Sequence, residues 1–226
     1  MFDFLKIEGP FATAIYKICN MIVVSAMWLL FCIPVFTSGA STTALYYTVQ
    51  KTLKNDRGNS WQCFFESFKR NFKQSTLVTL ILLAIAFVCI TDIQLTGLLG
   101  ETMSPVGGMR IFFIIVLILT CIYAIWVFSY IARFESTLKQ CLKTGLLLFI
   151  MHFPITVIVG LIAAGTVALL IIMWPLVFIM PSVSVWLISY FTEKVFRRYM
   201  SDEDKELEDD LNKNWREDRE GNRIKK

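Results

Sequence analysis

One absence dominates this sequence: the 49 residues from Thr144 to Thr192 contain no charged side chain. A helix that crosses the hydrocarbon core of a bilayer needs roughly 20 apolar residues, so this stretch is long enough for two spans and a turn. Soluble proteins rarely expose apolar surface of that size to water. The absence excludes an ordinary soluble domain and indicates an integral membrane protein.

The chain also lacks the residue spacings of metal and disulfide sites. His152 is its only histidine, and no cysteine or carboxylate stands at ligand spacing from it. The six cysteines form no C-x-x-C pair, and most fall in apolar segments, where cysteine behaves as a small hydrophobic residue. We therefore expect no metal site, no cofactor and no disulfide framework.

Motifs of common enzymes are missing as well. The sequence contains no G-x-x-x-x-G-K-[ST] loop, no H-E-x-x-H helix and no G-x-S-x-G turn. Nucleotide hydrolysis through a phosphate loop and intramembrane zinc or serine hydrolysis are therefore without support. We predict that the protein is not an enzyme.

Charge is scarce and unevenly placed. Charged residues make up 18% of the chain, below the roughly 25% of soluble domains. The last 26 residues hold ten acidic and seven basic side chains, whereas residues 1–200 hold fifteen basic and eight acidic ones. A basic body on a membrane protein indicates loops that face the anionic lipids of the cytoplasmic leaflet, and we expect no nucleic-acid partner.

The apolar pattern predicts an all-α, polytopic membrane protein with a bundle of about five transmembrane helices. Residues 1–200 form the predicted transmembrane domain, and residues 201–226 form a charged cytoplasmic tail that is too polar to fold alone. The predicted spans cover residues 14–36, 75–98, 110–132, 153–174 and 175–192.

Lysine and arginine counts predict the orientation. With five spans, twelve of the fifteen basic residues of the body fall on one side and three on the other. The prediction is a multi-pass protein of the bacterial cell membrane, with an extracellular N-terminus and a cytoplasmic C-terminus.

Three amphipathic helices are predicted on the cytoplasmic face, at residues 41–54, 60–73 and 136–151. The second carries an aromatic stripe at helical spacing. One interpretation of such helices is anchoring at the membrane surface or packing under the bundle, and the other is docking of a partner. The predicted partner contacts are the stripe residues Trp61, Phe64, Phe65, Phe68 and Phe72.

Two features inside the spans have alternative explanations. Lys17 and Asp92 carry opposite charges at similar predicted depths, so they either form an ion pair or extend separately to the outer headgroups. In the fourth span, small residues at i, i+4 and i+8 allow close helix contact, either within the bundle or with another subunit such as a second copy. That stripe consists of Gly160, Ala164 and Ala168.

A longer pattern surrounds the end of the first span. It reads N-x7-W-x5-P-x2-T-x-G-x4-A-L-Y and is formed by Asn20, Trp28, Pro34, Thr37, Gly39, Ala44, Leu45 and Tyr46. The segment 64–73 and the step at 132–135 complete it. These residues resemble the YesL-like family of small bacterial membrane proteins, a family of unknown function linked to carbohydrate ABC importers in Gram-positive bacteria. The family supplies no catalytic residues that could be transferred.

The resemblance implies an accessory membrane subunit that binds the permease subunits of an oligosaccharide importer and the surrounding lipids. Pro34, Thr37 and Gly39 are expected to form a corner that aims the helix containing Leu45. Two alternatives stand beside this expectation: a self-contained homodimeric transporter or channel, and a membrane-anchored regulator that recruits a partner through its acidic tail.

Overall fold

The computed structural model describes residues 10–55, 59–99, 105–200 and 202–224, and every regular element in these ranges is helical. The elements are α1 (Pro10–Cys32), η2 (Val35–Thr37), α2 (Ser38–Thr48), η3 (Val49–Lys54), α3 (Ser60–Leu99), α4 (Pro105–Arg133), α5 (Leu138–Met151), α6 (Phe153–Ile172), η4 (Trp174–Phe178), α7 (Met180–Tyr199) and α8 (Asp202–Ile224). The protein is an all-α, polytopic membrane protein, as predicted.

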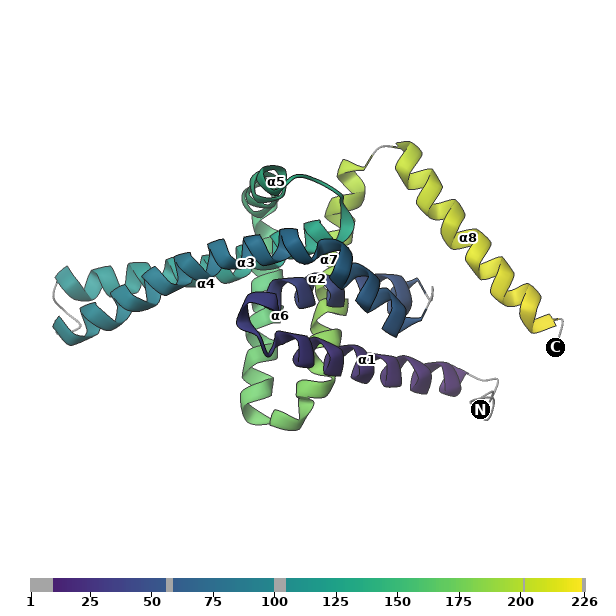
Figure 1. Ribbon diagram of the computed structural model, residues 1–226, viewed down its shortest axis with the longest axis horizontal. Coiled ribbons are helices and arrows are strands. Elements are labelled where there is room, and N and C mark those ends of the chain that lie inside the picture. The colour runs from purple at the N-terminus through teal and green to yellow at the C-terminus, as the bar shows by residue number, and fades with distance from the viewer. Residues whose placement is uncertain (1–9, 56–58, 100–104, 201, 225–226) are drawn as a thin grey trace.

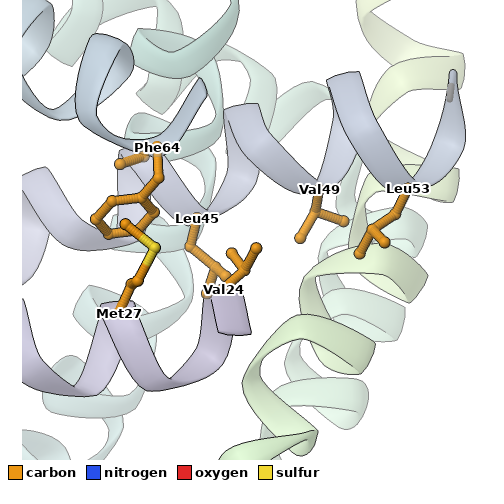
Figure 2. Close-up of a cluster of buried hydrophobic side chains, with 7 residues drawn as sticks. Val24, Met27, Leu45, Val49, Leu53 and Phe64 are labelled. Carbon is orange, nitrogen blue, oxygen red and sulfur yellow. The ribbon is translucent and has the colours of Figure 1, made fainter. Parts of the chain in front are cut away.

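Helix α2 and the π-helical segment η3 form the centre of the molecule. They contact α1, α3, α4 and α7 and are buried over most of their length. One apolar cluster joins them to α1 and α3, and Figure 2 shows Val24, Met27, Leu45, Val49, Leu53 and Phe64 meeting there. The predicted interfacial helix 41–54 is therefore an internal element, which corrects its assignment to the lipid surface.

The buried face of α2 and η3 also carries hydroxyl and amide groups, among them Ser41, Thr43, Thr48, Gln50 and Thr52. Thr43 Oγ1 lies 3.0 Å from Ser75 Oγ of α3, and Thr48 donates to the carbonyl of Ala44 at 2.7 Å. Polar side chains between helices are typical of packing inside a membrane protein. They made this segment look surface-exposed in the sequence.

Helix α3 is a single helix of 40 residues and merges the predicted interfacial helix 60–73 with the predicted span 75–98. No proline interrupts the sequence between Ser60 and Leu99, so the change from amphipathic to apolar composition does not break the backbone. The second half of α3 and the first half of α4 form a two-helix arm that extends away from α1 and α2 (Figure 1).

Helices α6 and α7 form a second hairpin through η4, and Figure 1 shows it running across the direction of α1, α3 and α4. A buried pair of hydroxyls fastens this hairpin to α1, because Ser25 Oγ and Ser182 Oγ lie 2.7 Å apart. Helix α5 lies over α4, with the buried Cys141 in a cluster that includes Val127. The α6–α7 hairpin therefore crosses the direction of the α3–α4 hairpin within the bundle.

Four described helical segments are long and apolar enough to cross a membrane: Ile15–Cys32, Ser60–Gly97, Gly108–Arg133 and Phe153–Ile172. The predicted fifth span, 175–192, is not one of them. The structure divides it between η4 and α7, and α7 extends to Tyr199 with charged residues in its last two turns. The tail, predicted to be solvated and partly helical, contains the helix α8 (Figure 1).

Candidate functional site: a charged pocket beneath the C-terminal helix

A buried polar network connects the centre of the protein to the end of α4. Tyr46 of α2 donates a hydrogen bond to Glu193 Oε1 at 3.1 Å, and its hydroxyl lies 2.7 Å from Thr192 Oγ1. Both Tyr46 and Glu193 are buried. Burial raises the pKa of the Tyr46 phenol, and the nearby Glu193 carboxylate raises it further.

Arg133, the last residue of α4, lies between two carboxylates. Its Nε is 3.4 Å from Glu193 Oε2, and one terminal nitrogen donates to Glu208 of α8. Only 18% of the Arg133 side chain and 5% of the Glu193 side chain are exposed. A charge pair in such surroundings is costly to break, because the remaining partner would be buried without compensation.

Lys54 is a third residue that acts electrostatically on Glu193. It ends η3 and donates to the carbonyl of Ser189 at 3.5 Å. Burial lowers the pKa of Lys54. Burial also raises the pKa of Glu193, although Arg133 and Lys54 both oppose this shift.

A cavity of about 520 Å³ opens next to this network. Its floor is formed by α2, η3 and the end of α4, and the first half of α8 covers it. The lining residues are Tyr46, Tyr47, Gln50, Lys51, Asn55, Arg70, Ala132, Arg133, Phe134, Glu135, Met200, Asp204, Leu207, Glu208 and Leu211. This volume is in the range of small-molecule sites.

Cations and a tyrosine form one wall of the pocket. Lys51 Nζ and the guanidinium of Arg70 each lie 5.1 Å from the centre of the Tyr47 ring, and Lys51 donates to the Tyr47 hydroxyl at 3.0 Å. Cation–π contacts of this kind orient flexible basic side chains. A weak ion pair with Glu66 at 3.7 Å also restrains Lys51.

Helix α8 is fastened over the pocket by carboxylates. Glu208 pairs with Arg133, and Asp209 receives two hydrogen bonds of 2.7 Å from Arg197 of α7. The Arg197 pair is exposed and contributes little in water. The Arg133–Glu208 contact, by contrast, is largely buried. Carboxylates of α8 thus lie beside the basic side chains of the pocket.

The aromatic stripe lies elsewhere and is mostly covered by the chain itself. Phe31 of α1 lies 5.9 Å from Phe64, 5.5 Å from Phe65 and 4.9 Å from Phe68, measured between ring centres. Phe64 is fully buried. Phe72 is half-buried beside Phe68, and Trp61 alone among the five is exposed. The stripe is therefore primarily a contact between α1 and α3.

The predicted corner has the expected shape. Pro34 is extended, and Thr37 Oγ1 lies 2.6 Å from the carbonyl of Phe31 and 2.7 Å from that of Pro34. Gly39 then allows α2 to approach α4 closely: a Cβ there would come within 2.6 Å of the Phe128 ring and would overlap Thr79 Oγ1. These three residues direct α2 into the centre of the protein.

The predicted ion pair between Lys17 and Asp92 is wrong. Ser60, at the start of α3, donates to Asn20 of α1 at 2.9 Å, so Lys17 lies near that end of α3. Asp92 is 32 residues further along the same helix, or about 48 Å at 1.5 Å per residue. The prediction assumed that α1 and α3 run in opposite directions, but α2 returns the chain and they run in the same direction (Figure 1).

The same geometry affects the predicted orientation. The start of α1 and the start of α3 lie at one end of the molecule (Figure 1), whereas the prediction placed the N-terminus and the first basic connection on opposite sides of the membrane. Their shared location follows from α2 and η3, which lead the chain back from the end of α1 to the start of α3.

The small-residue stripe of α6 is divided between two environments. A Cβ at Gly160 would lie 2.9 Å from Ile122 Cδ1, so this end packs against α4. Ala164 and Ala168 are exposed, and the neighbouring Gly165 has open space where a Cβ would stand. One end of the stripe therefore packs within the chain, which agrees with the first of the two interpretations, close contact inside the bundle.

Sequence reasoning missed the pocket and the polar network beside it, which is formed by Tyr46, Arg133, Glu193 and Glu208. Their positions are far apart in the sequence, and nothing in their spacing brings them together. The available signal was a charge at the end of each apolar segment: Arg133 follows one and Glu193 another. Among the residues with described side chains, no group of three or more histidine, cysteine or acidic residues could hold a metal ion.

Comparison with known proteins adds one partial match. The family model "Protein of unknown function, DUF624" matches residues 21–93, which include the corner, α2 and most of α3. This match is consistent with the YesL-like resemblance. No curated protein and no solved structure matches the chain. The pocket floor on α2 and η3 lies inside the matched region, whereas α8 lies outside it.

Proposed function

We propose that the chain is a non-catalytic accessory subunit of the bacterial cell membrane that binds the permease subunits of a carbohydrate ABC importer. The observation that carries this proposal is the two-helix arm formed by α3 and α4. Large apolar side chains on both helices are exposed, including Phe87 at 71% and Phe112 at 61%. Only 22% of the apolar stretch of α3 within Ser60–Gly97, and 17% of that of α4 within Gly108–Arg133, is buried in the chain itself.

An arm of this kind supports lateral association. Between helices in a bilayer, association comes from close packing and hydrogen bonds, since lipid and protein surfaces are equally apolar. A long, uncovered hairpin offers a surface for spans of another protein without a change in its own fold. The choice of importer permeases rests on the resemblance, and the match over residues 21–93 agrees with it.

The charged pocket is proposed to face the cytoplasm. Arg133 closes a candidate span, and Lys51, Lys54 and Arg70 gather at the same end of the molecule. Basic residues are retained on the cytoplasmic side of bacterial membranes. Helix α8 would then be a cytoplasmic element.

Photocrosslinking in native membranes tests the proposal. A photoreactive phenylalanine analogue is placed at Phe87 or Phe112 of the arm, and separately at Ile171, an apolar position on α6 that is at least as exposed. We expect permease subunits to be captured from Phe87 and Phe112 at higher yield than from Ile171. Permease subunits should also co-purify with the unmodified protein. Recovery of the chain alone, or crosslinks only to a second copy, would instead favour the self-contained homodimer.

Trp61 gives a separate test of the aromatic stripe. It is the one stripe residue that remains exposed, so a crosslink from Trp61 to a permease would restore part of the predicted contact surface. Substitution Trp61→Ala should leave co-purification unchanged if the arm provides the interface.

A further inference from the structure

The charges that line the pocket are balanced only because α8 is present. Three cations face it, from Lys51, Arg70 and Arg133, and three carboxylates, from Glu135, Asp204 and Glu208. Two of those carboxylates belong to α8. Without α8 the same pocket would carry a net charge of +2 and would attract an anion.

Gln50, which lines the floor of the pocket, has a buried side-chain oxygen that the protein does not use as a hydrogen-bond acceptor. Gln50 is 7% exposed, and its Oε1 has no hydrogen-bond partner. Nearly all buried acceptors in proteins are paired, so such an oxygen indicates a missing donor. Gln50 and Lys51 both belong to η3, and π-helical segments are frequent at functional sites.

We propose that this pocket binds a phosphate ester that carries free hydroxyl groups, with the chemistry of glycerol phosphate. The phosphate lies among Arg70, Lys51 and Arg133, and a hydroxyl of the ligand donates to Gln50 Oε1. Arginine binds phosphate through paired, charge-assisted hydrogen bonds, which suits Arg133 and Arg70. Glu208 occupies the phosphate position on Arg133 when no ligand is bound.

Glu208 is therefore a built-in competitor. Ligand binding displaces its carboxylate, so α8 loses its largely buried contact with Arg133 and is held less firmly over the pocket. The same chemistry has two sources: a soluble phosphate ester, or the headgroup of a phosphatidylglycerol molecule at the end of the α4 span. The proposal does not depend on the identity of a protein partner.

The test uses the purified full-length protein and glycerol 3-phosphate, measured by isothermal titration calorimetry in detergent. Glu208→Gln removes the competitor and should tighten binding by roughly tenfold, since a hydrogen bond to a charged group is involved. Arg70→Gln should weaken it by a similar factor. The matched control is Lys69→Gln, an exposed neighbour that does not line the pocket and should leave affinity unchanged.

A second experiment tests whether the ligand is a lipid headgroup. Hydrogen exchange of residues 202–214 is followed in phosphatidylcholine nanodiscs with and without phosphatidylglycerol, and faster exchange with phosphatidylglycerol in the wild type but not in Arg70→Gln supports a headgroup ligand. Calorimetric binding of glycerol 3-phosphate supports a soluble ester. The proposal is overturned if neither probe acts on the wild type or on Glu208→Gln, or if Arg70→Gln and Lys69→Gln behave alike. Arg70 is exposed, so its substitution leaves the folded core intact.

Discussion

Tyr46 and Glu193 are 147 residues apart in the sequence, yet the Tyr46 hydroxyl donates to the Glu193 carboxylate in the centre of the protein. This contact joins α2 to α7 and positions Glu193 against Arg133. It is the first link in a series that continues through Arg133 to Glu208 of α8. The folding of the centre and the docking of the C-terminal helix are therefore connected.

Removing the Tyr46 hydroxyl should weaken both the folded centre and the docking of α8. Tyr46→Phe keeps the ring but leaves Glu193 Oε1 without its donor, which costs about 1–3 kcal/mol for a buried acceptor. We expect a lower melting temperature in detergent and faster hydrogen exchange in α8. Tyr47→Phe is a suitable control, because its hydroxyl meets only the half-exposed Lys51. Equal melting temperatures for Tyr46→Phe and the wild type would contradict the role of this contact.

The pH dependence of stability should contain a contribution from Glu193. Burial raises its pKa above 4.5, so the folded protein binds the proton more tightly than the unfolded chain. Its contribution is therefore fully present below 4.5 and is lost as the pH rises through the higher folded-state pKa. The melting temperature of the wild type relative to Glu193→Gln should fall as the pH is raised from 4.5 towards neutrality. A constant difference would show that Glu193 does not titrate in this way.

Gly39 should tolerate no side chain. Gly39→Ala places a Cβ within 2.6 Å of the Phe128 ring, so the α2–α4 contact must open, at a cost of about 1–3 kcal/mol or more. Gly165→Ala is the matched control, since a Cβ there meets nothing within 4 Å and the alanine favours the helix by roughly 0.5–1 kcal/mol. Thermal unfolding in detergent should separate the two variants in opposite directions.

The direction of α1 relative to α3 can be tested by crosslinking. In a background without native cysteines, Asn20→Cys with Ser60→Cys should react with a short bismaleimide, because the two side chains are in hydrogen-bond contact. Lys17→Cys with Asp92→Cys should not react. Efficient coupling of the second pair would restore the antiparallel arrangement that charge complementarity predicted.

The sequence predicts those parts of the fold that depend on local composition. The helix 138–151 was expected at 136–151, and α6 begins at Phe153, because Pro154 favours the first turn of a new helix. The corner at Pro34 and Thr37 is also local, since Thr37 bonds to carbonyls three and six residues earlier.

Features that depend on the burial of polar residues were not predictable in this way. Serines and threonines on α2 look like a hydrophilic surface, but here they pair with a hydroxyl of the neighbouring helix α3 or with a carbonyl of α2 itself. The predicted Lys17–Asp92 pair failed for the same reason. Because α2 leads the chain back through the centre of the protein, α1 and α3 run in the same direction, and the two charges lie at different depths. The pocket draws its lining from four separate elements and the C-terminal helix, a combination that no single segment reveals.

The central position of α2 has a consequence for biosynthesis. The ribosome completes this helix early, but its hydroxyls at Tyr46 and Thr43 meet partners on α7 and α3, and those on α7 are made about 147 residues later. Until α7 is made, the Tyr46 hydroxyl of the nascent chain lacks its hydrogen-bond partners Thr192 and Glu193. Prematurely terminated chains should consequently be preferred substrates for membrane quality-control proteases, and nearly the whole chain must be made before its middle is finished.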